Sequence, residues 1–164
     1  MCGITGFYNP TCKKNDLSHN LKLMSKSISH RGPNDEGSWL DFGIGLGLAH
    51  RRLSIIDLSK SAHQPMISIS GRFVMVFNGE IYNHKDLRKK LNSKNINWKG
   101  HGDTETLINC IEHWGIENTL EKVIGMFALV LWDKKTKILS LTVDRLGEKP
   151  LYYGKSNSTF LFGS

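Results

Sequence analysis

The chain begins with Met1-Cys2-Gly3-Ile4-Thr5-Gly6-Phe7-Tyr8, a strand-like stretch that carries a cysteine directly behind the initiator methionine. Gly3 to Tyr8 are predicted to form a short strand, which Asn9-Pro10 ends. Once Met1 is removed, Cys2 becomes the first residue and carries a thiol and an α-amine together. An α-amine with a pKa of about 8 is able to take a proton from a thiol with a pKa of about 8.5. We therefore expect Cys2 to be a nucleophile activated by its own amine, the alternative being an incidental cysteine.

Length and cysteine content indicate one globular domain in a reducing compartment. A chain of 164 residues buries about 70% of its unfolded surface and needs no disulfide or metal for stability. The three cysteines, Cys2, Cys12 and Cys110, form neither a disulfide framework nor a paired metal motif, so Cys12 is expected to be a loop thiol and Cys110 a core thiol. The sequence has no targeting segment and no apolar run of about 18 residues. A cytoplasmic protein without a membrane partner is expected.

Charge and motif patterns exclude several function classes. The net charge of +7 comes from lysines and arginines that are spread along the chain without an aromatic stacking motif, so no nucleic-acid partner is expected. Gly43, Gly45 and Gly47 do not match the G-x-G-x-x-G pattern and lie within a strand pattern, which excludes dinucleotide binding. The seven histidines show no H-E-x-x-H or comparable pairing. We therefore assign no metal site.

Helical spacing of apolar residues predicts three helices. One covers Asp16 to Ser29 and is expected to have its cap near Asp16. A short helix contains Leu87 and Leu91, and a third runs to Trp114 from an N-cap at Asp103 or Thr104. The segment from His30 to Gly37 is rich in glycine, proline and polar residues, so it is predicted to be a loop.

Apolar runs predict several strands in addition to the first, namely Gly45 to His50, Leu53 to Ile56, Phe73 to Phe77, Met126 to Trp132 and Ile138 to Val143. The run at 73–77 is continuously apolar, as is typical of a buried strand, and it leads into Asn78-Gly79-Glu80. The last two strands are separated by the polar hairpin connection 133–137. Strands mixed with a few helices, without strict alternation, predict an α+β fold with mostly antiparallel sheets.

Seven short blocks in a fixed order carry a family resemblance that covers the whole chain. They are Cys2-Gly3-Ile4-Thr5-Gly6, His30-Arg31-Gly32-Pro33, Arg52-Leu53-Ser54-Ile55-Ile56-Asp57, His63-Gln64-Pro65-Met66, Asn78-Gly79-Glu80-Ile81-Tyr82-Asn83, Gly102-Asp103-Thr104-Glu105 and Asp144-Arg145-Leu146-Gly147-Glu148-Lys149-Pro150-Leu151-Tyr152-Tyr153. The chain resembles the glutaminase domain of class II glutamine amidotransferases, and within that family it is most similar to the domain of asparagine synthetases. The resemblance assigns residues 1–164 to this one domain.

The resemblance implies an N-terminal nucleophile hydrolase fold, a four-layer αββα sandwich with two mostly antiparallel sheets. It also implies that Cys2 attacks the side-chain amide of L-glutamine. Ammonia then leaves, and water hydrolyses the γ-glutamyl thioester to glutamate.

The resemblance further implies roles for individual residues. The Asn78 side chain and the Gly79 N–H would stabilise the oxyanion of the tetrahedral intermediate. The remaining family positions would form the glutamine pocket, with Arg52 binding the α-carboxylate, Asp103 binding the α-ammonium, and Glu80 completing the pocket together with the backbone of Leu53, Ser54, Ile55 and Ile56.

Each of these positions has a simpler alternative when it is taken alone. Arg52 can be a surface cation, and Asp103 can be a helix cap worth about 1 kcal/mol. Asn78-Gly79 can be a type I′ hairpin turn, which is the default interpretation of that dipeptide. The ordered occurrence of all seven blocks favours the catalytic roles, and a catalytically silent module with the same fold is the alternative for the whole chain.

The resemblance also implies a partner that these residues do not include. Asparagine synthetases join this domain to a synthetase domain, whose Ser-Gly-Gly-x-Asp-Ser pyrophosphate loop is absent from this sequence. ATP and magnesium are expected only in that domain, so no cofactor is expected in this one. The acceptor of ammonia is left open between aspartate and a sugar acid of surface-polysaccharide biosynthesis, and a homodimer is left open as well.

Overall fold

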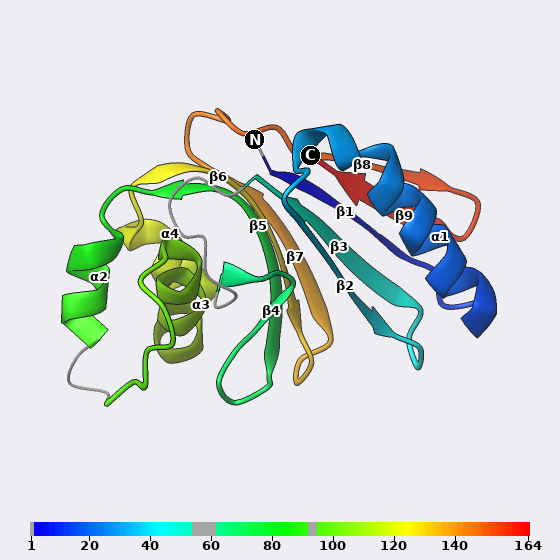
Figure 1. Ribbon diagram of the computed structural model, residues 1–164. Coiled ribbons are helices and arrows are strands. Elements are labelled where there is room, and N and C mark those ends of the chain that lie inside the picture. Colours follow the sequence, from blue (N-terminus) through cyan, green and yellow to red (C-terminus); the bar gives the residue numbers. More distant parts are fainter. Residues whose placement is uncertain (1, 54–61, 92–94) are drawn as a thin grey trace.

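The computed structural model describes residues 2–53, 62–91 and 95–164, which form four layers (Figure 1). Helix α1, Lys14–Ser27, covers the outer face of the first sheet, and helices α2 to α4 cover the outer face of the second. The two sheets pack against each other between these helices. The predicted αββα sandwich of an α+β fold is therefore confirmed.

The first sheet has five strands in the order β2-β3-β1-β9-β8. Their bounds are Gly3–Tyr8 (β1), Asp35–Asp41 (β2), Leu46–Arg52 (β3), Tyr152–Ser156 (β8) and Thr159–Gly163 (β9). Strand β1 is central, so the N-terminal residues lie between strands from the middle and from the end of the chain. This position fixes the start of the chain in the structure.

The second sheet has four strands in the order β4-β5-β6-β7. Their bounds are Met66–Ile67 (β4), Phe73–Ile81 (β5), Gly125–Asp133 (β6) and Ile138–Val143 (β7). The helices on its outer face are His84–Leu91 (α2), Asp103–Trp114 (α3) and Ile116–Lys122 (α4). Every strand pairing in the described part of the chain is antiparallel, as predicted.

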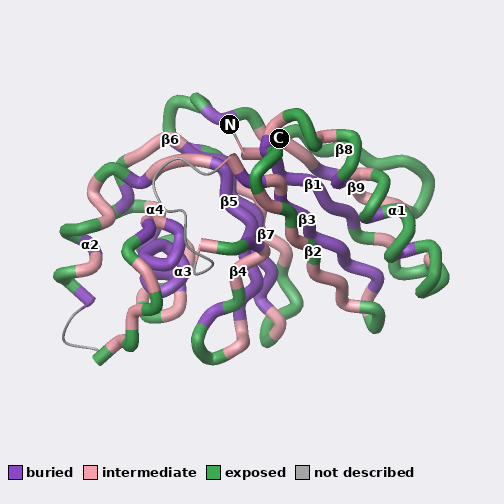
Figure 2. The backbone as a smooth tube through the Cα atoms, viewed as in Figure 1, coloured by how far each residue is buried: buried purple, intermediate pink, exposed green. Residues whose placement is uncertain are grey.

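The inner faces of both sheets become polar at one end. Between the sheets, Ile4 of β1, Leu46 and Leu48 of β3, and Val74 and Val76 of β5 are fully buried. Buried backbone runs along β1, β3 and β5 (Figure 2). Because side chains alternate along a strand, the next inner-face positions of these strands are 2, 50 and 78. Those positions hold Cys2, His50 and Asn78. The apolar core between the sheets thus gives way to polar side chains at the end where all three strands meet.

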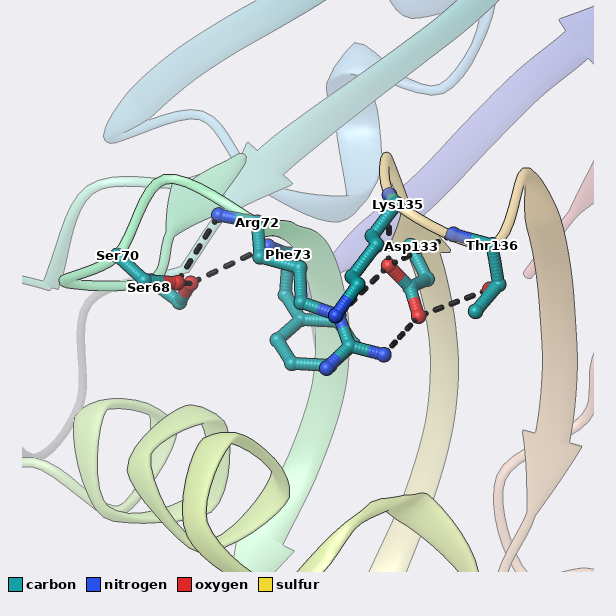
Figure 3. Close-up of polar contacts among 7 residues, drawn as sticks. All are labelled: Ser68, Ser70, Arg72, Phe73, Asp133, Lys135 and Thr136. Carbon is teal, nitrogen blue, oxygen red and sulfur yellow. Dashed lines mark hydrogen bonds and ion pairs between the residues drawn. The ribbon is translucent and has the colours of Figure 1, made fainter.

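The opposite end of β5 is fixed by a polar cluster around Asp133 (Figure 3). Its carboxylate accepts two hydrogen bonds from Arg72, at 2.9 and 2.6 Å, and others from the Lys135 N–H and the Thr136 hydroxyl. The Arg72 guanidinium, which also lies over the Phe73 ring, holds the pKa of the Asp133 carboxyl well below its usual range. The cluster joins the start of β5 to the β6–β7 hairpin.

Several predicted boundaries are wrong. Helix α1 begins earlier than predicted, after an N-cap at Lys13 whose side chain makes no capping bond, and a 3₁₀ turn, Ser29–Arg31, follows the helix. The predicted loop from His30 to Gly37 ends early because β2 begins at Asp35 and pairs with β3. Pairing with a distant strand overrides the local glycine and proline signal here.

The remaining differences have similar tertiary causes. The N-cap of α3 is Gly102, not Asp103 or Thr104, because the Asp103 carboxylate is turned toward β5. Asn78-Gly79 is not a hairpin turn, since β5 continues through both residues. Of the predicted strand at Leu53 to Ile56, Leu53 is outside any strand and residues 54–56 lie outside the described residues. Strands β2, β4, β8 and β9 and helix α4 were not predicted.

Candidate active site

The polar ends of β1, β3 and β5 line a pocket of about 160 Å³. It contains every described residue of the predicted site, namely Cys2, Arg52, Leu53, Asn78, Gly79, Glu80 and Asp103. Ser54, Ile55 and Ile56 lie outside the described residues. The chain therefore brings together residues that are up to about a hundred positions apart in sequence, as the family resemblance implies.

Cys2 is held by contacts to its thiol and to its backbone. The Leu53 N–H donates a hydrogen bond to Cys2 Sγ at 3.4 Å, and Arg31 Nε donates one to the Cys2 carbonyl oxygen at 3.2 Å. The Cys2 thiol also donates to the Leu53 carbonyl oxygen at 3.8 Å, so both backbone groups of Leu53 contact the sulfur. Gly3 permits the approach of Arg31, because a Cβ at Gly3 would lie 3.2 Å from the Arg31 Cβ. The contact of Arg31 with the nucleophile was not predicted from the sequence.

The register of β5 directs the Gly79 N–H toward the pocket. Gly79 is opposite Phe127 of β6. Both backbone groups of Phe127, however, bond to Asp144 on the side of β6 away from β5: the Phe127 N–H donates to Asp144 Oδ2 at 3.0 Å, and the Phe127 carbonyl oxygen accepts from the Asp144 N–H at 2.9 Å. Alternate residues of a strand send their N–H groups to opposite sides. The N–H of Gly79 therefore points away from β6, toward the open side of β5.

The N–H groups on either side of Gly79 show the same direction. The Phe77 N–H donates to Gln64 Oε1 at 2.6 Å, and the Ile81 N–H donates to Asp103 Oδ2 at 2.9 Å. Side chains thus bind the donors on either side of Gly79, and the Gly79 N–H between them faces a pocket that Gly79 itself lines. A Cβ at Gly79 would be 2.2 Å from the Met126 carbonyl oxygen, so only glycine fits this position.

The side chain of Gln64 takes the place of a strand residue beside β5, where the pairing of β4 with β5 has ended. Strand β4 pairs Met66 with Met75, and the same register continued would place Gln64 opposite Phe77. The Gln64 side chain makes both bonds that a backbone partner would make, because its amide also donates to the Phe77 carbonyl oxygen at 3.1 Å. Within the described residues no strand pairs with this edge of β5 beyond Phe77, and the edge becomes a wall of the pocket.

His50 supports the same peptide from the first sheet. Its Nε2 lies 3.1 Å from the Phe77 carbonyl oxygen, so Nε2 carries the proton and donates it. The pKa of His50 is lowered to about 4, mainly by burial and in smaller part by the charge of Arg52, while the hydrogen bond to Phe77 and the charge of Asp35 oppose the shift. His50 is therefore a neutral donor at physiological pH. Neither His50 nor Gln64 was predicted as part of the site.

Charges of both signs line the pocket. Arg52 lies at the end of β3 and is 8% exposed, and Asp103 lies at the start of α3. The Asp103 carboxylate oxygens accept hydrogen bonds from the N–H groups of Ile81 and Thr104, and each oxygen has a second lone pair that can accept another hydrogen bond. Glu80 also lines the pocket, together with Lys149, which is 9% exposed. A pocket with separate cationic and anionic groups suits a zwitterionic amino acid.

The Asp144 carboxylate shapes the loop that carries Lys149. It accepts N–H groups from Leu146, Glu148 and Lys149 at 3.0 to 3.1 Å, and these bonds lower the pKa of Asp144 against the effect of burial. The loop belongs to the last of the seven blocks, for which the resemblance implied no role. The structure assigns it to the rim of the pocket.

The sequence matches a family model described as a glutamine amidotransferase domain over residues 1–164. This chain belongs to the glutamine amidotransferase domain family. This chain is 37% identical over 166 residues to asparagine synthetase [glutamine-hydrolyzing] 1 of Bacillus subtilis. It is 35% identical over 182 residues to a putative asparagine synthetase [glutamine-hydrolyzing] of Methanocaldococcus jannaschii. Both alignments cover 100% of this chain. They cover 26% of the Bacillus subtilis protein and 34% of the Methanocaldococcus jannaschii protein.

Two solved structures share the fold of this domain. The glutamine phosphoribosylpyrophosphate amidotransferase of Bacillus subtilis superposes with a TM-score of 0.77 at 17% identity, covering 99% of this chain and 41% of that one. A second structure, an allosteric regulatory enzyme of purine biosynthesis, gives a TM-score of 0.76 at the same identity. At this identity the likeness concerns the fold. Within the described residues, no helix is long and apolar enough to cross a membrane.

Proposed function

We propose that Cys2, after removal of Met1, hydrolyses the side-chain amide of L-glutamine through a γ-glutamyl thioester. The observation that carries this proposal is the convergence of the Cys2 thiol, the Asn78 amide and the inward-facing Gly79 N–H on one pocket. A nucleophile beside two donors is the arrangement that acyl transfer requires.

The reaction begins with proton transfer from the Cys2 thiol to its own α-amine. The thiolate attacks the amide carbon of glutamine, forming a C–S bond and moving the carbonyl electron pair onto oxygen. Asn78 and the Gly79 N–H stabilise this oxyanion, and losing one such donor typically costs about 10²- to 10³-fold in rate. The α-ammonium then protonates the leaving nitrogen as the C–N bond breaks, and ammonia departs.

Water completes the cycle. The α-amine, again neutral, takes a proton from the attacking water, whose oxygen adds to the thioester carbon and produces a second oxyanion in the same site. Collapse of this intermediate breaks the C–S bond and releases glutamate. The thiolate returns, so cleavage consumes one water and needs no cofactor within residues 1–164.

Charge determines how glutamine is oriented in the pocket. Arg52 offers a bidentate fork to the α-carboxylate, and Asp103 accepts the α-ammonium through its remaining lone pairs. Held in this way, the side chain of glutamine extends toward the thiol. The Leu53 N–H, which contacts Cys2 Sγ, keeps the sulfur at the end of this path.

We further propose that the released ammonia is passed to a synthetase domain of the asparagine synthetase type, with aspartate as its acceptor. The relatives that carry this name contain this domain as about a quarter to a third of their length. ATP and magnesium would act only in that second domain.

The test separates cleavage from binding. Cys2→Ala should abolish ammonia release from glutamine and still bind glutamine by calorimetry, whereas Arg52→Ala should mainly weaken binding. Cys12→Ala is the matched control, because Cys12 lies away from the pocket. Mass spectrometry must first confirm that Met1 is absent. Ammonia release by Cys2→Ala at the wild-type rate would refute the proposal.

A further inference from the structure

Ser164 joins the strand that carries Cys2 to the side chain of Asn78. Its hydroxyl oxygen accepts a hydrogen bond from the Ile4 N–H at 3.2 Å and another from Asn78 Nδ2 at 3.3 Å. The first donor belongs to the five-stranded sheet and the second to the four-stranded sheet. One oxygen thus bridges the two sheets at the end where the pocket lies.

Strand pairing places this hydroxyl. Strand β9 pairs with β1 so that Gly163 is opposite Thr5, and the next residue, Ser164, donates its own N–H to the Ile4 carbonyl oxygen at 2.9 Å. Ile4 faces the second sheet, where Asn78 is 2% exposed and occupies the same inner face of β5 as Val76. The position of the Ser164 backbone therefore depends on the sheet, and the backbone bonds do not require the hydroxyl.

The chemistry of a primary amide makes this contact directional. The terminal torsion of an asparagine side chain is broad and nearly two-fold, so its oxygen and nitrogen can exchange places at little steric cost. An amide nitrogen has two hydrogens, whereas the amide oxygen only accepts. In the structure the Ser164 oxygen accepts from the Ile4 N–H and from one Nδ2 hydrogen, so this contact holds the amide with Nδ2 toward Ser164 and leaves the second Nδ2 hydrogen for another acceptor.

We propose that the Ser164 hydroxyl is a positioning group for the oxyanion site, which holds the Asn78 amide with a donor toward the substrate and fixes that donor relative to the strand of Cys2. This inference rests on the proposed function of Cys2 and Asn78. Without the hydroxyl, the Asn78 amide spends part of the time rotated by about 180°. In that orientation it presents its oxygen to the developing negative charge, which raises the activation barrier for hydrolysis.

The kinetic test uses the full-length protein without Met1. Ser164→Ala keeps the backbone N–H that bonds to Ile4, and it should lower kcat for glutamine hydrolysis about tenfold while KM changes less than about twofold. Ser164→Thr retains a hydroxyl and should recover most of kcat. Ser158→Ala, which removes an exposed hydroxyl at the β8–β9 turn, is the control and should match the wild type.

A double-mutant cycle shows whether Ser164 acts through Asn78. If it does, Ser164→Ala should cost about tenfold in the wild-type background and less than about twofold in an Asn78→Ala background. A tenfold loss in both backgrounds would overturn the proposal, as would a Ser164→Ala variant with wild-type kcat.

Alkylation of Cys2 separates positioning of the amide from general disturbance of β1. Displacement of iodide from iodoacetamide by the thiolate forms no oxyanion on a carbonyl carbon, so its rate reports on the thiol alone. In a Cys12→Ser background, the rate at Cys2 should be the same with Ser164 and with Ala at position 164. A parallel fall in alkylation and hydrolysis would overturn the proposal in favour of a structural role.

Failure of the underlying function gives a different result. If Cys2→Ala still hydrolyses glutamine, the proposed function is wrong, whatever Ser164 does. If Cys2→Ala and Asn78→Ala are both impaired and Ser164→Ala is not, only the inference about Ser164 is wrong.

Discussion

Acidification should destabilise this domain through His50, in a pH range set by its burial. The folded protein binds a proton at His50 only near pH 4, whereas the unfolded chain binds it near pH 6.5. Between these values unfolding takes up a proton, so the free energy of unfolding falls as the pH falls. The contribution is complete above about pH 6.5, and it is lost progressively down to about pH 4.

The size of the effect follows from the shift in pKa. A histidine whose pKa falls from 6.5 to about 4 on folding withdraws about 2 kcal/mol from the free energy of unfolding between pH 8 and pH 5. Domains of this kind have roughly 5 to 15 kcal/mol in total, so the loss is measurable. His50→Gln retains an amide donor for the Phe77 carbonyl oxygen and does not titrate, so it should remove this part of the pH dependence.

Urea unfolding at pH 8 and pH 5, followed by circular dichroism, measures the effect. The wild type should lose about 2 kcal/mol more than His50→Gln over this interval. The comparison uses the change with pH, so a constant packing cost of the glutamine cancels. His19→Gln, on the exposed face of α1, controls for the removal of a histidine and should decline with pH as the wild type does. Equal slopes for the wild type and His50→Gln would refute the reasoning.

Three further outcomes are expected. Gln64→Leu leaves the buried Phe77 N–H without its acceptor and should lower the free energy of unfolding by about 2 kcal/mol, measured in urea; a change below about 0.5 kcal/mol would contradict the strand-replacing role. Asp133→Asn should flatten the loss of thermal stability below about pH 4, because the folded carboxylate has a lowered pKa and its stabilisation disappears as the pH falls below the unfolded value; an unchanged acid limb of Tm would argue against it. Asparagine should release ammonia far more slowly than glutamine, because its side chain is one methylene too short to reach the Cys2 sulfur from the charged anchors; comparable rates in the same ammonia assay would contradict the proposed binding mode.

Local patterns in the sequence were enough to find most of the core. The continuous apolar run at Phe73 to Phe77 indicated a buried strand, and β5 is buried on both faces because helices cover one side and the first sheet covers the other. The spacing of Leu87 and Leu91 also predicted α2 correctly, and both leucines are fully buried. Cys110 is a core thiol as expected, and burial raises its pKa to about 12.

Boundaries were predicted less well, because distant partners set them. Asp35 follows a glycine- and proline-rich segment, yet it starts β2 because β3 offers it a backbone partner at Arg52. Strand β4 has only two residues, too few for any periodic signal. Asp103 has the sequence context of a helix cap, but its carboxylate binds the Ile81 N–H, and only the packing of α3 against β5 makes that donor available.

The sequence by itself determined the chemical groups of the site, since a thiol behind the initiator methionine, an Asn-Gly pair after an apolar strand, and an arginine and an aspartate of opposite charge are all visible in the letters. Only the tertiary structure decided how these groups face one another. The direction of the Gly79 N–H follows from the register of β5 and β6, the neutral state of His50 from its burial between two sheets, and the contact of Ser164 with Asn78 from the pairing of the last strand with the first. Each of these features depends on residues that are far apart along the chain, so a local sequence pattern does not reveal it. Backbone pairing and burial in the folded protein fix the distances and the orientation of these residues.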